Sequence, residues 1–347
     1  MYKIVVFGAG ANGLKFINNK QEYFETLIIA VIDNNKNRWG DCLENYFVEP
    51  PQNINNKQYD YVVITTSNGD SKSSIRSQLK KMGVPDEKIY DIEEYRRKVF
   101  VDNIYLTRNY LPKKKTTLNG KKIIIYSAIM GDYEGIKDIE KNWQQYDNID
   151  VKYIFFTDNE KISSNTWDIR VIKDGSLSSR YLSKHIKLFP ELYLEKCDYS
   201  IWVDGKFQIV GNLIEYLEQY LRNSTMLFFP HFARKDIYEE AKTCIEMGVG
   251  KKDDIIRQIE YYKTDGFPAN SGLYEGGCIV RKYGDSEVKY LMKQWWDEIM
   301  KFSYRDQISL PYILWKNNFI PDISGEDLYN NKWLRCCRNF NIKEEIK

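Results

Sequence analysis

A single aspartate in the second half of the chain stands where a carboxylate can do chemistry. Asp204 directly follows the apolar run 201–203, and Gly205 comes next. A strand that ends in a carboxylate can hold a divalent cation, because hard cations take oxygen ligands and can bridge two diphosphate oxygens. The alternative is an aspartate that begins a turn after a buried strand.

A second acidic stretch, Arg305-Asp306-Gln307, precedes the apolar run 308–315. Arg305 and Gln307 are candidates for binding a donor. Asp306 is a candidate for holding sugar hydroxyls or for deprotonating an acceptor hydroxyl. A base would need a raised pKa in a partly dry pocket. The structural alternative is a helix cap, because aspartate before a periodic apolar segment marks a helix start.

Three basic residues precede Asp204 at helical spacing. Arg180, Lys184 and Lys187 fall at i, i+4 and i+7 of a helix expected over 179–189. Such a cationic face could clamp a diphosphate and stabilise a departing nucleotide. A solvated basic face explains the same spacing.

The elements around these residues alternate between strands and helices. Strands are expected at 122–126, 151–156, 167–172, 201–203 and 226–230, and helices at 179–189 and 290–300. Alternating elements that lead to an acidic strand end are the plan of a nucleotide-binding α/β half.

Seven blocks in order carry a family resemblance. They are 126–131, 156–158, the basic residues of 180–187, 201–205, 231–234 with 238–241, 272–277 with Arg281, and 302–309. From about 121 to 319 the sequence thereby resembles the glycosyltransferase-like domain best known from plant pectin and mucilage galacturonosyltransferases, which also occurs in bacterial polysaccharide loci. Each block is weak alone, and their order makes the match specific.

The resemblance implies a GT-A-like fold, a nucleotide-sugar donor such as a UDP-hexose or UDP-uronic acid, and a glycan acceptor in surface or capsular polysaccharide synthesis. It also implies Mn²⁺ or Mg²⁺ held by Asp204 and His231. Such enzymes often carry Asp-x-Asp, whereas Lys206 stands at the third position here. One carboxylate would hold a metal less firmly, and Lys206 could itself offset diphosphate charge.

Three further residues are carried over as site candidates. Asp158 and Arg234 are expected to bind the donor, and a flexible loop at 272–277 is expected to place Glu275 at the sugar. An alternative role for the glycines of 272–277 is a tight turn. The alternative for His231 is a hydrogen-bonded histidine at the end of a strand.

The first hundred residues carry the dinucleotide-binding pattern in its usual context. A strand at 3–7 runs into Gly8, Gly10 and Gly13, and a second strand at 27–32 ends in Asp33. These glycines let backbone N–H groups approach a diphosphate, and Asp33 could bond a ribose hydroxyl. A third strand at 60–65, a helix at 71–82 and a last short strand complete a Rossmann-like parallel sheet. It either binds a nucleotide or nucleotide-sugar or serves as a structural, protein-contacting module.

The chain is therefore expected to be α/β, with four parts. They are a Rossmann-like module at 1–98, a linker at 99–118, a GT-A-like glycosyltransferase domain at 119–325 and a helical tail at 326–347. The linker lysines 113–115 are either solvated or weakly drawn to anionic lipid. The tail either packs on the core or mediates association into a homo-oligomer.

Composition removes several classes of protein. A net charge of +2 without a basic field argues against nucleic acid, and six cysteines without Cys-x-x-Cys spacing argue against zinc or a disulfide framework. No apolar run approaches the roughly 20 residues that cross a bilayer. With no signal peptide pattern, a cytoplasmic location is expected, at the inner face of the membrane if the linker binds lipid.

Two other functions remain open at this point. One is a non-catalytic, nucleotide-sugar-sensing or scaffold protein of a polysaccharide assembly, because Lys206 replaces a second carboxylate. The other is an NAD(P)-dependent sugar-modifying enzyme that uses the first module. Against it, that module has no Tyr-x-x-x-Lys pair and no room for hydride-transfer machinery.

Overall fold

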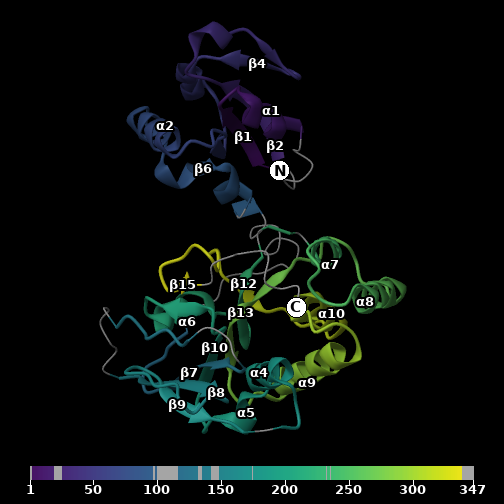
Figure 1. Cartoon of the computed structure of the whole chain (residues 1–347). Coiled ribbons are helices and arrows are strands. Elements are labelled where there is room, and N and C mark those ends of the chain that lie inside the picture. Colours follow the sequence, from purple (N-terminus) through teal and green to yellow (C-terminus); the bar gives the residue numbers. More distant parts are fainter. Residues whose placement is uncertain are drawn as a thin grey trace. The chain divides into compact units, whose positions relative to one another are not determined.

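The chain divides into two compact units, Met1–Tyr110 and Leu111–Lys347 (Figure 1). A computed structural model describes residues 2–18, 26–96, 98–99, 116–131, 135–141, 148–173, 175–231, 233–234 and 236–337. Most of the predicted linker, 100–115, therefore lies outside the described residues.

The first unit is built on a six-stranded sheet with the order β3-β4-β2-β1-β5-β6. Its strands are β1 (Tyr2–Phe7), β2 (Thr26–Ile32), β3 (Cys42–Leu43), β4 (Tyr46–Glu49), β5 (Tyr61–Ile64) and β6 (Ile89–Asp91). All neighbours are parallel except β3, which runs antiparallel to β4. The Rossmann-like parallel sheet is confirmed, and the short β3–β4 hairpin is an addition that the sequence pattern did not indicate.

Both faces of this first sheet are covered. Along β1, Ile4 and Val6 belong to one buried cluster, whereas Val5 and Phe7 belong to another on the opposite face. The helices include α1 (Ala11–Asn18), α2 (Gly69–Lys81) and the helical residues 92–96 and 98–99, with short 3₁₀ turns at Lys36–Arg38, Pro51–Asn56 and Asp86–Lys88. A strand buried on both faces reads as a continuous apolar run, which is what residues 4–7 show.

The second unit holds a seven-stranded sheet with the order β14-β12-β13-β10-β7-β8-β9. The strands are β7 (Lys122–Ile129), β8 (Asp150–Thr157), β9 (Asp168–Val171), β10 (Tyr199–Val203), β12 (Met226–Pro230), β13 (Tyr274–Lys282) and β14 (Asp322–Ile323). Only β13 runs antiparallel to its neighbours, β10 and β12. This sheet is the α/β half expected from the alternating elements.

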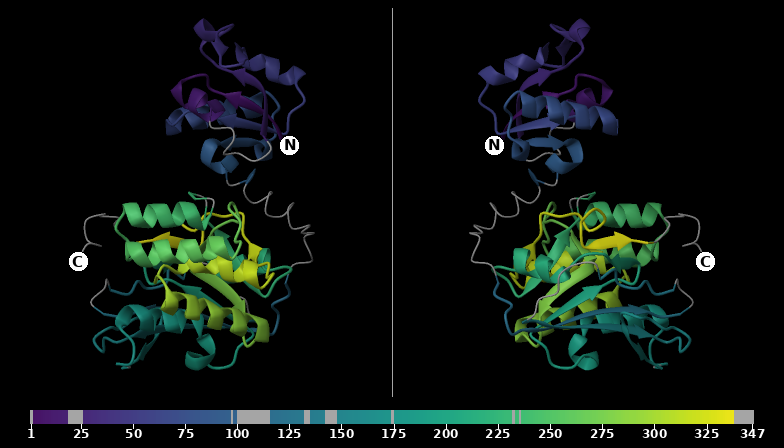
Figure 2. Two further views of the ribbon diagram at one scale, coloured as in Figure 1. Left: turned by 90° about the vertical axis from the view of Figure 1, so that its right-hand side faces the viewer. Right: turned by 90° about the vertical axis from the view of Figure 1, so that its left-hand side faces the viewer.

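Helices cover both faces of the second sheet. On one face, α6 (Leu213–Tyr220) packs in a cluster with Ile123 and Ile125 of β7. On the other, α4 (Ser179–Leu188) contacts β7, and α10 (Asp306–Lys316) contacts β13, with α9 (Ser286–Lys301) against both helices (Figure 2). The remaining helices are α5 (Pro190–Tyr193), α7 (Ile237–Glu246) and α8 (Lys252–Thr264). Within the described residues, no helix combines the length and apolarity needed to span a bilayer.

The helical tail expected from residue 326 is wrong for the part that the structure describes. Residues 326–337 hold no helix, and β15 (Leu334–Cys336) pairs antiparallel with β11 (Phe207–Ile209). Leu328, Trp333 and Leu334 are buried in the same core cluster as α6. The apolar spacing of this segment thus reflects burial in turns and a short strand. Residues 338–347 lie outside the described part of the chain.

Candidate active site

Three strands of the second unit bring the predicted acidic residues to one edge of the sheet. The backbone N–H of Asp204, just after β10, donates to the carbonyl of Gly277 at 2.8 Å, and that of His231, just after β12, donates to Leu273 at 2.9 Å. Because β13 is antiparallel to β10 and β12, its first residues lie at their carboxyl ends. Asp204, His231 and Glu275 therefore share the edge at which α/β sheets commonly bind ligands.

Glu275 does not lie in the expected flexible loop. It is the second residue of β13, and its neighbour Gly276 is also in this strand. A Cβ at Gly276 would lie 2.9 Å from Nζ of Lys187 and 3.6 Å from Oδ2 of Asp306. A glycine fits here because side chains of the site approach the strand closely. In the sequence, the same glycines are typical of a loop.

Asp204 is held in one orientation and remains accessible. The indole N–H of Trp202 donates to its Oδ1 at 2.7 Å, and Nζ of Lys187 lies 3.9 Å from the same oxygen. Its side chain is 31% exposed. A carboxylate fixed on one oxygen and open on the other can accept hydrogen bonds from a ligand.

Asp306, the first residue of α10, is held between two lysines of α4. Its Oδ2 lies 2.6 Å from Nζ of Lys187 and 3.1 Å from Nζ of Lys184, and all three side chains are less than a fifth exposed. Burial raises the pKa of Asp306, but the two ammonium groups outweigh it and hold that pKa well below its ordinary value. This is the reverse of what a general base needs, so the geometry argues against the predicted role of Asp306 as a base.

Buried residues around Lys187 fix its position. The hydroxyl of Tyr126 donates to the carbonyl oxygen of Lys187 at 2.9 Å, and the guanidinium of Arg281 donates to the same hydroxyl. Nζ of Lys187 lies 5.7 Å from the ring centre of Trp295, whose N–H donates to the carbonyl of Asp306 at 3.0 Å. Tyr126 and Trp295 were not predicted as site residues, since nothing in a single sequence distinguishes them from core aromatics.

Arg180 takes a different contact from the two lysines. Its guanidinium lies 4.3 Å from the ring centre of Tyr304, a cation–π arrangement. The helical spacing therefore correctly brings Lys184 and Lys187 together, while Arg180 lies one turn earlier against an aromatic ring.

A second charged cluster lies beside Glu275. Glu240, which is buried, accepts hydrogen bonds from Arg234 and, at 3.1 Å, from Arg305. Gln307 connects the two groups, because its Nε2 donates to Glu275 at 3.0 Å while its Oε1 lies 3.4 Å from Arg305. Burial raises the pKa of Glu240, but the two guanidinium groups outweigh it and lower that pKa. Glu240 is thus a buried ionic centre, a role that its place in the block 238–241 did not indicate.

At physiological pH His231 is neutral, whereas Glu275 is close to its pKa. Burial raises the pKa of Glu275 to about 7, although Lys206 partly opposes this. The pKa of His231 is lowered to about 4, mainly by burial and next by the positive charge of the nearby Arg234. Nε2 of His231 lies 3.5 Å from Oε1 of Glu275. Glu275 is thus the carboxyl of this site that can gain or lose a proton near pH 7.

The surroundings of His231 do not fit a metal ligand. The backbone N–H of Arg234 points to its Nδ1 at 3.2 Å, and the guanidinium of Arg234 lies 2.8 Å from its Nε2. Within the described ranges, no three His, Cys, Asp or Glu side chains gather into a cation site built by the protein alone. The residues present therefore do not fit a cation held jointly by Asp204 and His231.

Asp158 and Lys206 are placed by contacts within the fold. Both carboxylate oxygens of Asp158 lie 2.9 Å from the backbone N–H of Gly131, which fixes the turn after β7. Nζ of Lys206 donates to the hydroxyl of Tyr329 at 2.9 Å. Burial lowers the pKa of Lys206, but Asp204 and Tyr329 outweigh it and raise that pKa, so its ammonium stays charged beside Asp204.

In the first unit, the glycines of the predicted dinucleotide turn have unequal roles. Gly8 has φ of 119°, and a Cβ at Gly13 would lie 2.0 Å from the carbonyl oxygen of Gly8, so both are required by the fold. A Cβ at Gly10 would meet no heavy atom within 4 Å. The carboxylate of Asp33 accepts from the backbone N–H of Ala9 at 2.7 Å, so it already stabilises the turn.

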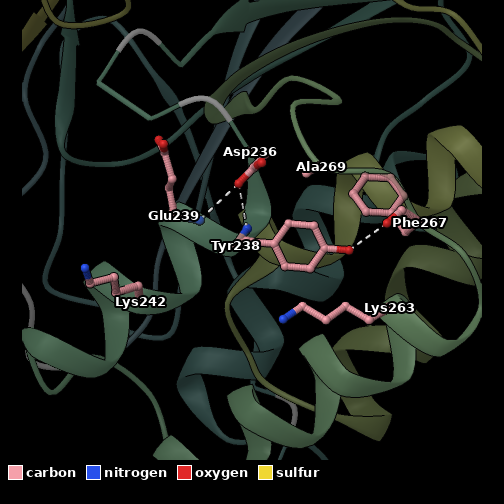
Figure 3. Close-up of a pocket in the computed structure, with 7 residues that line it drawn as sticks. All are labelled: Asp236, Tyr238, Glu239, Lys242, Lys263, Phe267 and Ala269. Atoms are coloured by element: carbon pink, nitrogen blue, oxygen red, sulfur yellow. Dashed lines mark hydrogen bonds between the residues drawn. The ribbon is translucent and has the colours of Figure 1, made fainter. Parts of the chain in front are cut away.

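A hollow of about 580 Å³ opens on the solvent side of α7, opposite the face that carries Glu240 (Figure 3). It is lined by Asp236, Tyr238, Glu239, Lys242, Lys263, Phe267 and Ala269. The hydroxyl of Tyr238 donates to the carbonyl of Phe267 at 2.7 Å, and Nζ of Lys263 lies 5.2 Å from the ring centre of Tyr238. Its volume is in the range of small-molecule sites. Of its lining residues, Tyr238 and Glu239 stand in a block that carries the family resemblance.

Comparisons with known proteins agree with the two units. Residues 1–90 match the family described as "C2185-like, N-terminal". The UDP-D-quinovosamine 4-dehydrogenase of Vibrio fischeri shares 23% identity over 23% of this chain and 70% of that chain, with a TM-score of 0.20. A likeness at that score supports no conclusion about fold or function.

The second unit has the informative matches. The probable hexosyltransferase MUCI70 of Arabidopsis thaliana is 26% identical over 211 residues, which are 54% of this chain and 36% of that protein. The chain thus spans about a third of the length of this relative. Residues 109–342 match the family described as "TOD1/MUCI70, glycosyltransferase-like domain". With most of its length in that match, the chain belongs to the TOD1/MUCI70 glycosyltransferase-like family.

Proposed function

We propose that the second unit is a glycosyltransferase that moves a sugar from a nucleotide-sugar to a glycan acceptor. The observation that carries the proposal is the accessible Asp204 beside the Lys184–Asp306–Lys187 cluster, at the carboxyl edge of the sheet. A carboxylate for hydroxyl groups next to ammonium groups for a diphosphate is the arrangement that such a donor requires. Family membership of residues 109–342 supports the same reading.

The proposed reaction exchanges one bond for another at the anomeric carbon of the donor sugar. The bond from this carbon to the diphosphate oxygen breaks, and the electron pair stays with the diphosphate. Ammonium groups already in place stabilise this developing charge without reorganisation. The bond from the acceptor oxygen to the anomeric carbon forms, and the acceptor hydroxyl loses its proton.

Glu275 is the proposed acceptor of that proton. It lies at the same strand edge as Asp204, is buried, and has a pKa near 7, so an ionised fraction is available at neutral pH. The side-chain amide of Gln307 fixes one of its oxygens at 3.0 Å. The proton passes from Glu275 to solvent after transfer.

The finer features of the proposal concern the substrates. The donor is proposed to be a UDP-hexose or UDP-uronic acid, since the named plant relative is a probable hexosyltransferase. The acceptor is proposed to be a growing surface or capsular glycan, with synthesis in the cytoplasm at the inner face of the membrane.

Release of UDP tests the proposal. The full chain is incubated with a panel of UDP-sugars and an acceptor library, with and without added Mn²⁺. We expect acceptor-dependent UDP release that falls at least about 100-fold in Asp204→Asn, a loss typical of removing one group that acts on the transition state. The matched control is Asp297→Asn, because Asp297 is 56% exposed on α9 and pairs only with Lys293 in the contacts described. Neither turnover nor nucleotide binding across a broad panel would refute the proposal.

A second candidate is a nucleotide-sugar sensor without transfer activity. Lys206 favours it, because it stands where many related enzymes are expected to carry a second carboxylate. UDP binding that depends on Asp204, without release of UDP from any donor in the presence of acceptors, would support the sensor.

A further inference from the structure

The charges beside Asp204 have an excess of cations. Three ammonium groups, those of Lys184, Lys187 and Lys206, lie about two carboxylates, Asp204 and Asp306. Beyond them, Arg234 and Arg305 share the carboxylate of Glu240. The diphosphate of a nucleotide-sugar carries one negative charge on each phosphate, so the excess has the sign that this group needs.

Three of these cations are ammonium groups near Asp204. Nζ of Lys187 lies 3.9 Å from its Oδ1, Lys184 shares Asp306 with Lys187, and Lys206 interacts electrostatically with Asp204 from two residues away. An ammonium group has three N–H donors. In the contacts described, Lys187 uses one on Asp306 and Lys206 one on Tyr329, which leaves donors for phosphate oxygens.

A divalent cation at this place would lie beside those ammonium groups. The repulsion between like charges is strong where burial lowers the effective dielectric constant. The carboxylates that could compensate are engaged, because Asp306 is held by two lysines and Glu240 by two arginines. His231, the other expected ligand, has both ring nitrogens facing Arg234.

We propose that the ammonium groups of Lys184, Lys187 and Lys206 neutralise the donor diphosphate in place of a divalent cation. The inference rests on the proposed function, and it replaces the Mn²⁺ or Mg²⁺ expected from the family resemblance. Lys206 then occupies the third position of the Asp-x-Asp pattern because it supplies the charge that a metal would otherwise bring. The glycine pair Gly276–Gly277 leaves the space, since a Cβ at Gly276 would displace Nζ of Lys187.

The test is calorimetric binding of UDP to the full chain in EDTA and in Mn²⁺. We expect the two dissociation constants to agree within about twofold, because the charge that UDP needs is already in the protein. A fall in affinity of tenfold or more in EDTA, restored by Mn²⁺ or Mg²⁺, would overturn the inference and leave the proposed function standing. No UDP binding in either buffer would overturn both.

Substitution of Lys206 sharpens the test. Lys206→Asp creates Asp-Gly-Asp and should lower UDP affinity at least about tenfold in EDTA, with recovery in Mn²⁺. Lys206→Met keeps an unbranched stem near the rings of Phe207 and Tyr329, and it should weaken binding in both buffers equally. The control Lys289→Asp makes the same charge change at an exposed position of α9 and should leave binding unchanged. Unaltered binding in both Lys206 variants, when circular dichroism shows them folded, would contradict the role given to Lys206.

Discussion

Replacing Glu275 by glutamine should make the second unit more stable at high pH than the unaltered protein. Burial raises the pKa of Glu275 from 4.5 to about 7, so between these values the folded state binds a proton that the unfolded chain has released. By linkage, stability falls as pH rises through this window and levels off above it. Between pH 5.5 and 8.5 the loss is about 2 kcal/mol, which a glutamine, having no charge, does not suffer.

The matched variant, Glu240→Gln, should have the opposite effect. Glu240 is buried against Arg234 and Arg305, and its pKa is lowered, so its charged form stabilises the fold above its ordinary pKa. Its removal leaves two guanidinium groups without their shared carboxylate and should cost about 3–5 kcal/mol. Both variants replace a buried carboxylate by an amide, and they do so in two neighbouring clusters of the same site.

Urea unfolding followed by tryptophan fluorescence measures both effects. All tryptophans except Trp39 lie in the second unit, so the signal reports mainly on that unit. The free energy of unfolding of Glu275→Gln should stay level between pH 5.5 and 8.5 while that of the unaltered protein declines. Equal destabilisation of Glu275→Gln at both pH values would show that Glu275 is an ionised, paired carboxylate, and the proton-acceptor role would fail with it.

Three further substitutions test other parts of the site. Asp306→Asn should lower the free energy of unfolding by about 3–5 kcal/mol, because it leaves Lys184 and Lys187 unneutralised; a loss below about 1 kcal/mol in urea unfolding would contradict the buried ion pairs. Tyr126→Phe removes the hydrogen bond to the carbonyl of Lys187, so it should lower the free energy of unfolding by about 1 kcal/mol and raise the Kd for UDP. An unchanged Kd would show that Tyr126 does not position Lys187 for binding. Gly10→Val, in open space in the first unit, should leave UDP-sugar turnover intact; lost turnover in a folded chain would show that both units share one active site.

Much of the scaffold follows from local sequence patterns. The apolar run of β1 with its glycine turn, and the apolar residues 201–203 ahead of Asp204, predict buried parallel strands that end at the sheet edge. The spacing of Lys184 and Lys187 predicts their common face, because helix geometry alone brings them together. These features depend on neighbours along the chain, so one sequence is enough to find them.

Other features depend on contacts between distant segments. Gly276 reads as a loop residue, yet it lies in β13, where Lys187 and Asp306 approach its backbone so closely that a side chain has little room. Glu240 reads as an acidic residue in the first turn of a helix, but Arg305, 65 residues away, makes it an ionic centre. The pKa of Asp306 is lowered by two lysines that outweigh its burial, and that of Glu275 is raised by burial. Residue type and spacing reveal neither the burial nor the partners.

A crystal structure of the full chain with an intact UDP-sugar analogue tests the central claim most directly. The account predicts a diphosphate within hydrogen-bond distance of Lys184, Lys187 and Lys206, and a donor sugar between Asp204 and Glu275. A nucleotide bound only in the first unit, or a diphosphate held away from these lysines, would contradict it.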